Sequence, residues 1–472
     1  MRRGDRLFWI YLAAFAAILF AFYPRTYAIE DEFNILSLSV AISRGTVLLD
    51  RAGLDLDADL VWHGHTISKF SPFHAALLTP AVAVSWRLAF AVAGLFAAWG
   101  ALVFRGMLRR EGLSSGWVAL YFLCAGLWFY SRTLMAAVPA SVMVLMGASL
   151  LLRDRSRPVL AGAALSAAGL LHPWMIPVAA ALAAGWWLDA PRGRMRPAAA
   201  LAAGAAPGAA ALLFYNWFTT GSPFMNAYSL LGTQYGFRGE HLGSFAPFYL
   251  GSLLIMPLGG WAALVPRWNR GLAVPAAIAT VLVMASLYYF RDGLGYGIAG
   301  LLPGQRFLLP ASLLACLPAA RFLSDRAARM HPSGGFAALL ERAVPATALA
   351  CFVGGFVLVS AGHKSYLDAH ASLQSALRAA LPDGSRVLVG ERAFKEFAPV
   401  LGRWTLRQMH DDRAPGAAER DGAYEVWLGA PGQPPPPGWF TGRAPSRVEI
   451  RSWVWKRDAW IAPPANAAKG AD

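Results

Sequence analysis

The sequence predicts a polytopic α-helical membrane protein of about eleven spans, followed by a small extracytoplasmic α/β domain. Residues of the AVILMFWYC set make up 57% of the 472 residues, and charged residues make up 15%. A soluble domain carries about 25% charged residues. Many apolar runs approach the roughly 20 residues that a spanning helix needs. Arginines gather in clusters between apolar runs, as the positive-inside rule requires of cytoplasmic loops.

These arginine clusters account for the net charge of +15, so nucleic-acid binding is not expected. They place the N-terminus in the cytoplasm. The first apolar run, 7–23, is followed by no clear small-x-small cleavage site, so we predict an uncleaved first span. The clusters are Arg2, Arg3 and Arg6; Arg105, Arg109 and Arg110; Arg153, Arg155 and Arg157; Arg192, Arg194 and Arg196; Arg267 and Arg270; and Arg321, Arg326 and Arg329.

The length of each run, and the prolines that interrupt it, define the spans. Pro72–Val84 is too short to span and is predicted to be interfacial or re-entrant. The stretch 158–189 is too long for one helix and is broken at His172-Pro173 into two short spans. The spans are 7–23, 86–104, 113–130, 133–152, the two halves of 158–189, 197–215, 246–265, 271–290, 306–322 and 343–361.

An odd number of spans places the C-terminal segment outside the cytoplasm. Residues 1–362 are predicted to form the membrane domain, with an external loop at about 24–85 that contains an amphipathic helix at Phe33–Arg44. Residues 365–464 form the external α/β domain, and 465–472 a disordered tail. The domain's expected elements are helices at Tyr366–Leu381 and Arg392–Leu401 and strands at Arg386–Val389 and near Trp404–Met409, Tyr424–Leu428 and Val448–Ile461.

An acidic triplet, Glu30-Asp31-Glu32, directly follows the first span. Adjacent carboxylates at a membrane boundary repel one another, which makes it costly to ionise all three. In a group transfer from a membrane-embedded phosphate ester, a carboxylate there can take the proton from the hydroxyl of the acceptor. The alternative is a solvated cap, because carboxylates also favour the N-terminus of a helix.

Two cations accompany the triplet on the external face. Lys69 precedes an apolar segment, and Arg306 opens an apolar span. Such cations can stabilise a phosphate leaving group as its charge develops, although both can also snorkel at the interface. His63 and His65 have a spacing that can chelate a metal from a strand, but no third ligand is fixed, so no metal site is predicted.

Four segments carry a resemblance to a known family: EDEFNILSLSVAISRG, SKFSPFHAALLTP, YNWFTTGSPFMNAY and GYGIAGLLPGQRFLLP. In this order they resemble integral-membrane glycosyltransferases with the GT-C fold, specifically bacterial relatives of protein O-mannosyltransferases and of the aminoarabinose transferase that modifies lipid A. The resemblance covers about residues 5–325. Two positions depart from the family pattern: Glu30 stands where relatives usually have Gly, and His172 where many have Arg.

The resemblance implies an inverting enzyme of the bacterial inner membrane that moves a sugar from a polyprenyl-phosphate donor to an acceptor hydroxyl on the extracytoplasmic face. It implies that Asp31 is the base with Glu32 beside it, and that Lys69 and Arg306 contact the donor phosphate. Further candidate substrate contacts are Glu30, His65, Tyr228 and Tyr296. The implied partners are the lipid-linked donor and membrane lipids. No cofactor is expected, and the need for a divalent metal, the sugar and the acceptor (protein, lipid or glycan) stay open.

Two other functions stay open at this point. A transporter or flippase of lipid-linked saccharides predicts inverted repeats and charges near the bilayer midplane, whereas no repeat is evident and the notable charges lie at the outer boundary. An O-antigen ligase or polymerase predicts key residues in a large late external loop, whereas the acidic triplet follows the first span.

Overall fold

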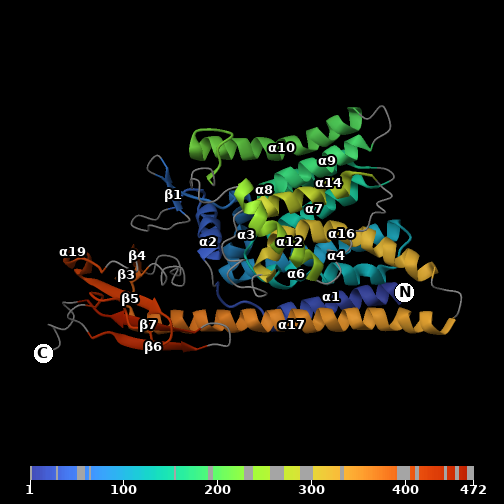
Figure 1. Ribbon diagram of the computed structural model, residues 1–472. Coiled ribbons are helices and arrows are strands. Elements are labelled where there is room, and N and C mark those ends of the chain that lie inside the picture. Colours follow the sequence, from blue (N-terminus) through green and yellow to red (C-terminus); the bar gives the residue numbers. More distant parts are fainter. Residues whose placement is uncertain are drawn as a thin grey trace. The chain divides into compact units, whose positions relative to one another are not determined.

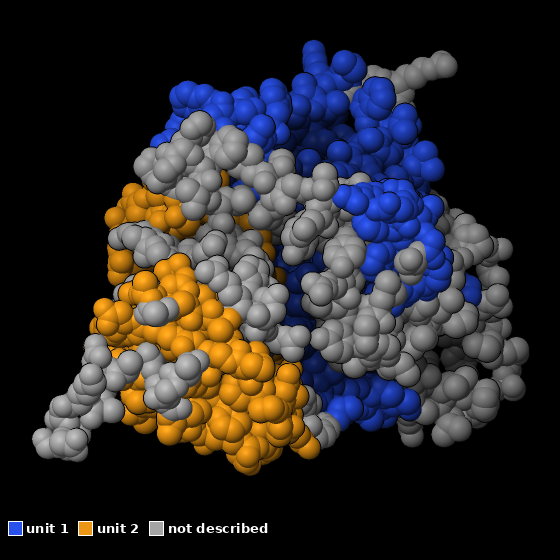
Figure 2. Space-filling model, turned by 60° about the vertical axis from the view of Figure 1, so that its left-hand side comes forward, with its two compact units in different colours: residues 1–22, 90–360 blue, residues 23–89, 361–472 orange. Residues whose placement is uncertain are grey.

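In the computed structural model the chain divides into two compact units (Figure 2). Unit 1 comprises residues 1–22 and 90–360, and unit 2 comprises residues 23–89 and 361–472. The structure describes residues 3–27, 30–49, 59–62, 65–153, 156–189, 195–227, 238–255, 271–287, 301–329, 334–390, 404–409, 414–440, 444–451 and 456–464.

Unit 1 is helical (Figure 1). Within the described residues, five stretches are long and apolar enough to cross a membrane: Gly4–Ala21, Trp86–Arg110, Met195–Thr220, Arg306–Asp325 and Ala346–Ala380. The elements are α1 (Arg3–Ala21), α4 (Ala89–Arg110), the 3-10 turn η2 (Ser115–Trp117), α5 (Val118–Phe122), α6 (Ala125–Tyr130), α7 (Ala137–Leu151), α8 (Pro158–Leu171), α9 (Met175–Leu188), α10 (Met195–Thr220), η4 (Gly239–His241), α12 (Leu242–Ile255), α14 (Ala273–Leu287), α16 (Leu301–Arg329) and the first part of α17 (Gly334–Ala380).

Small residues let α8 and α10 pack closely. A Cβ on Gly162 of α8 would overlap the carbonyl oxygen of Leu201, and a Cβ on Gly204 of α10 would overlap that of Val159. Glycine at both positions removes this conflict, and such small-residue contacts are typical of helices in a bilayer. The break expected at His172 is present, because α8 ends at Leu171 and His172 has an extended backbone (φ −148°, ψ 108°).

The structure divides the predicted third span, 113–130, into two short helices. α5 ends at Phe122 and α6 begins at Ala125, because Cys124 has an extended backbone (φ −68°, ψ 101°). The indole N–H of Trp128 donates to the carbonyl oxygen of Phe122 at 2.6 Å, so a side chain satisfies a backbone group next to the break. Broken helices are tolerated at membrane depth where protein surrounds them, and these residues are almost all buried.

Aromatic rings join α1, α5 and α17. Tyr11 contacts Phe352 with ring centroids 5.7 Å apart, and Phe15 contacts Phe356 at 5.4 Å. Phe122 contacts Tyr11 and Phe15 at 5.8 and 5.4 Å. The contacts advance by one turn along α1 and α17 together, so these two helices run parallel, side by side in Figure 1. Their C-terminal ends therefore leave unit 1 at the same end.

The first part of unit 2 is the segment between α1 and α4. Its elements are α2 (Glu30–Ser43), β1 (Asp59–Trp62), β2 (His65–Ser68), α3 (Pro72–Val84) and the 3-10 turn η1 (Trp86–Leu88). The strands pair antiparallel, with Asp59 opposite Ser68 and Trp62 opposite His65. This hairpin was not among the expected elements. The expected helix at Phe33–Arg44 begins earlier, at Glu30, and most of its residues are buried rather than arranged on one apolar face.

The second part of unit 2 begins in α17, which runs without a break from Gly334 to Ala380. This single helix replaces two expected elements, a span at 343–361 and a separate helix at Tyr366–Leu381. No proline lies between residues 346 and 381, so nothing interrupts the helix where the chain passes from unit 1 into unit 2.

Five strands follow: β3 (Arg386–Gly390), β4 (Thr405–Met409), β5 (Ala423–Gly429), β6 (Ser446–Arg451) and β7 (Lys456–Ala462), with the short helix α19 (Ala417–Arg420). The sheet order is β4-β3-β5-β7-β6, with β4, β3 and β5 parallel and β7 antiparallel to both neighbours. The first three strands match expected ones, whereas the stretch expected near Val448–Ile461 forms two antiparallel strands, β6 and β7. The helix expected at 392–401 and the tail at 465–472 lie outside the described residues.

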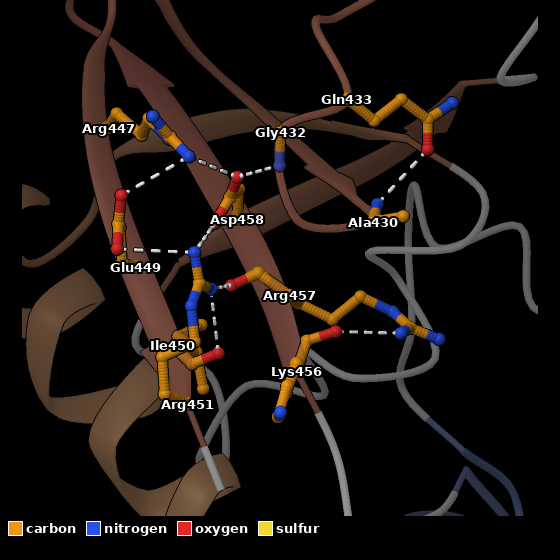
Figure 3. Close-up of polar contacts among 10 residues, drawn as sticks. All are labelled: Ala430, Gly432, Gln433, Arg447, Glu449, Ile450, Arg451, Lys456, Arg457 and Asp458. Atoms are coloured by element: carbon orange, nitrogen blue, oxygen red, sulfur yellow. Dashed lines mark hydrogen bonds and ion pairs between the residues drawn. The ribbon is translucent and has the colours of Figure 1, made fainter.

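Ion pairs stabilise the edge of this sheet (Figure 3). Arg447 and Arg451 on β6 contact Asp458 on β7 at 2.7 and 2.8 Å, and each contacts Glu449 at 3.2 Å. The Gly432 amide donates to Asp458 at 2.7 Å. Burial raises the pKa of Asp458, but hydrogen bonds from Gly432, Arg451 and Arg447 outweigh it and hold that pKa below its usual value. Charged side chains on an edge strand also discourage pairing with another chain.

Candidate active site

Asp31 and Lys69 come together in unit 2. Lys69 Nζ lies 3.7 Å from Asp31 Oδ1, and 20% and 29% of the two side chains are exposed. The distance exceeds that of a hydrogen bond, so the attraction is Coulombic and partly screened by water. The pair is loosely held, and both charges are accessible from solvent.

The elements on either side fix the position of Lys69. β2 ends at Ser68, whose hydroxyl accepts a hydrogen bond from the Phe70 amide at 3.1 Å. α3 begins at Pro72, a residue favoured in the first helical turn. The Lys69 ammonium lies 5.2 Å from the centre of the Phe70 ring. The short turn from strand to helix therefore holds the lysine beside the first turn of α2.

Asp31 occupies that first turn, where the helix dipole favours a carboxylate. Its neighbour Glu32 is 1% exposed and Asn34 is fully buried. α2 packs along α3, and the Thr79 hydroxyl lies 3.3 Å from the carbonyl oxygen of Ser39. A solvated cap, the alternative interpretation of the triplet, does not describe Glu32.

The chain that leads from α1 to α2 is also anchored within unit 2. The Tyr23 hydroxyl donates to the carbonyl oxygen of Arg87 at 2.6 Å. Tyr27 is buried, with ring contacts to Phe33 at 5.8 Å and Trp86 at 6.2 Å. Burial raises the pKa of the Tyr27 hydroxyl, so this side chain stays neutral. These contacts limit the positions that the acidic triplet can take.

One contact in this region had no signal in the sequence. The Thr26 hydroxyl lies 3.2 Å from Gln374 Oε1 on the part of α17 that belongs to unit 2, although 348 positions separate the two residues. His74 on α3 is likewise buried, at 3% exposed. No sequence pattern marks Thr26, Gln374 or His74, because an isolated polar residue carries no pattern until the fold places it.

Arg306 lies in unit 1, in the second turn of α16 rather than at its start. Its guanidinium is half-buried and lies 4.7 Å from the centre of the Phe307 ring. That ring in turn contacts Trp174 at 4.9 Å and Tyr249 at 6.4 Å. A cation within about 6 Å of a ring centre is attracted electrostatically to the face of the ring.

The Gly-Ser-Pro segment forms an ordered turn at the end of α10. The Thr220 hydroxyl lies 2.7 and 3.0 Å from the carbonyl oxygens of Asn216 and Ser222, and the Asn216 amide donates to Pro223 O at 3.1 Å. Gly221 has a φ of +77°, a conformation that favours glycine. The turn thus explains the residue types of this motif.

The remaining candidates are only partly placed. Glu30 is the first residue of α2 and His65 is the first residue of β2. Tyr228 and Tyr296 lie outside the described residues. No group of three or more His, Cys, Asp or Glu side chains is arranged to hold a metal ion in the part of the chain that the structure describes.

Comparison with solved structures shows a shared fold. The structure of ArnT from Cupriavidus metallidurans in the apo state matches with a TM-score of 0.57 and 13% identity, over 96% of this chain and 97% of that one. The same enzyme bound to undecaprenyl phosphate matches with a TM-score of 0.54, the same identity and the same coverage. No protein-family model and no curated sequence matches the chain. The fold class implied by the sequence, a polytopic GT-C-like membrane protein with a C-terminal α/β domain, is confirmed.

Proposed function

We propose that this protein, which has the fold of ArnT, is a membrane glycosyltransferase that moves a sugar from a polyprenyl-phosphate donor to an acceptor hydroxyl. The observation that carries the proposal is the Asp31–Lys69 pair, which joins a carboxylate and an ammonium at one solvent-accessible place. A base and a phosphate-binding cation are the two groups that such a transfer needs. The ArnT structure with bound undecaprenyl phosphate supports a lipid phosphate as the leaving group.

In the proposed reaction the carboxylate of Asp31 takes the proton from the acceptor hydroxyl. The acceptor oxygen then attacks the anomeric carbon from the face opposite the phosphate. The new bond from oxygen to carbon forms as the bond from the anomeric carbon to the phosphate oxygen breaks, which inverts the configuration. The bonding electrons leave with the polyprenyl phosphate, and the ammonium of Lys69 stabilises the charge that develops there.

The ion pair suggests how the site changes when the donor binds. The donor phosphodiester carries a single negative charge, as a carboxylate does, but that charge increases as the sugar leaves, so an ammonium binds the departing phosphate more strongly. With Asp31 3.7 Å away, Lys69 can turn toward a donor phosphate without breaking a short hydrogen bond. The Asp31 carboxylate then accepts the proton of the acceptor hydroxyl while Lys69 contacts the phosphate.

Arg306 and Glu32 have supporting roles in this proposal. Arg306 is proposed as a further contact to the donor phosphate on the family resemblance alone. Glu32 is buried in α2 beside the base, where it fixes the orientation of the first helical turn. The reaction occurs on the extracytoplasmic face of the inner membrane, and the C-terminal domain selects or positions the acceptor.

Ranked substitution of the acidic triplet tests the assignment of the base. Asparagine is nearly the same shape as aspartate but cannot take a proton, so Asp31→Asn should abolish transfer while donor binding survives. Glu32→Gln should reduce transfer less, and Glu30→Gln least. The donor and product are first identified by mass spectrometry of glycoconjugates and lipid carriers from cells with and without the protein.

The order of the three effects decides the assignment. A larger loss from Glu32→Gln or Glu30→Gln than from Asp31→Asn moves the base to that residue. Full activity in all three variants refutes carboxylate catalysis at this site. A flippase differs in its product: it would move the donor across the bilayer with its sugar still attached, whereas a transferase releases polyprenyl phosphate.

A further inference from the structure

Arg132 is a buried arginine that the proposed reaction does not use. It lies in the turn between α6 and α7 and is 1% exposed, the largest fully buried side chain among the described residues. Its Nη1 donates to the carbonyl oxygen of Ser360 at 3.2 Å, and its Nη2 donates to that of Phe22. Burying a guanidinium is costly unless its N–H groups are satisfied. The two carbonyl contacts offset part of this cost, so the position of the two acceptors in the chain indicates why the arginine is buried there.

Both acceptors have a special place in the chain. Phe22 follows the last residue of α1, so its carbonyl belongs to a helix C-terminus, where carbonyl groups lack helical partners and the dipole attracts a cation. Ser360 lies within α17. Phe22 and Ser360 are also the last residues of unit 1 before the chain passes into unit 2, at two of the three places where it crosses between the units. The Arg132 side chain thus donates hydrogen bonds to the last residue of unit 1 at both of these places.

We propose that Arg132 is a positioning residue for sugar transfer, which sets where the segment that carries Asp31 begins. Only eight residues separate Phe22 from Asp31, and the contacts of Tyr23 and Tyr27 restrict that short connection. A shift at Phe22 is therefore passed along the chain to the first turn of α2. Displacement of a catalytic group by about 1 Å can lower a rate by about a hundredfold.

Arg132 is not needed to hold α1 against α17 along their length. The ring contacts of Tyr11 with Phe352 and of Phe15 with Phe356 hold the two helices together, at residues that precede Phe22 and Ser360 in the chain. Loss of Arg132 should accordingly loosen the ends of the two segments and leave the helix pair intact. This difference separates a positioning role from a general contribution to folding.

The test replaces Arg132 with methionine, which is similar in length but donates no hydrogen bond, and with lysine, which keeps the charge but reaches fewer acceptors. Arg105→Met is the matched control, because Arg105 pairs with Asp5 at 2.7 Å near the opposite end of α1. Each full-length protein is reconstituted in lipid nanodiscs. Amide hydrogen exchange is measured along the chain, and kcat and the donor KM are measured with the donor identified from cells.

In Arg132→Met we expect faster exchange in residues 19–27 and 357–366, with unchanged exchange in α8 and α9. We expect kcat to fall by about ten- to a hundredfold, with the donor KM changed less than about threefold, because donor binding itself is not removed. Arg132→Lys should restore part of both effects. Arg105→Met should leave exchange in residues 19–27 and 357–366 as in the wild type.

Three results would overturn the proposal: wild-type exchange at both segments in Arg132→Met, faster exchange throughout unit 1, or an unchanged kcat. If Arg132→Met does not fold, Arg132→Lys decides, and wild-type exchange and kcat in that variant refute the positioning role of Arg132. The kinetic measurement rests on the proposed function, but the exchange measurement does not. If the wild type transfers no sugar, the proposed function fails, while hydrogen exchange still tests whether Arg132 holds the segments at Phe22 and Ser360 in place.

Discussion

Replacement of Lys69 by alanine separates catalysis from stability at the candidate site. The Asp31–Lys69 pair spans 3.7 Å with both side chains partly exposed. Two unit charges at this distance attract by about 1 kcal/mol in bulk water, and measured exposed pairs contribute about 0.2–1 kcal/mol. Lys69→Ala should therefore lower the free energy of unfolding by at most about 1 kcal/mol.

The expected effect on transfer is larger. Loss of a charge-assisted contact to a developing phosphate charge costs about 1.5–3 kcal/mol, which corresponds to a roughly ten- to hundredfold fall in kcat/KM. The assay measures release of polyprenyl phosphate by detergent-purified protein, alongside its thermal unfolding. Lys364→Ala is the matched control, because Lys364 also forms a partly exposed ion pair, with Asp368, in the same unit.

The comparison between the two lysines decides the outcome. If Lys364→Ala lowers kcat/KM as much as Lys69→Ala does, the loss at Lys69 reflects a general change in the protein rather than a phosphate contact. If Lys69→Ala keeps wild-type transfer, the lysine only lies at the membrane interface and the donor phosphate binds elsewhere.

Four further predictions test other parts of the structure. Arg306→Ala should lower kcat/KM by about tenfold or more without unfolding the protein, and wild-type kinetics would remove Arg306 from the donor site. Glu32→Gln should lower the thermal unfolding temperature as well as transfer, because its carboxylate is buried; an unchanged unfolding temperature would contradict this. Asp458→Asn should destabilise the C-terminal sheet by about 1–3 kcal/mol at neutral pH. Because the pKa of Asp458 is lowered in the folded state, the difference from wild type should shrink as the pH falls below about 4, the unfolded value, and amide exchange in β5 and β7 measures it. A reporter that is active only outside the cytoplasm, fused after Pro464, should be active, and an inactive fusion would show that the predicted topology is wrong.

Much of the fold could be predicted from local patterns. The break at His172, the bounds of the short apolar segment Pro72–Val84 and the strand at Arg386–Val389 follow from proline positions, run lengths and residue types, which act within a few residues. The GT-C-like fold followed from the order of four motifs. Local patterns did not reveal the division of 113–130 at Cys124, because that break depends on a hydrogen bond from Trp128 and on burial by neighbouring helices.

By itself, the sequence determined the membrane class, most of the helical segments and the residue types of the candidate site, because hydropathy and motif order are properties of neighbouring residues. Only the tertiary structure decided which of those residues meet. It placed Lys69 beside Asp31, 38 positions earlier, and buried Glu32 while Asp31 stayed accessible. It also joined Arg132 to Phe22 and Ser360. Contacts between distant positions depend on how whole helices and strands pack, and no local pattern records that packing.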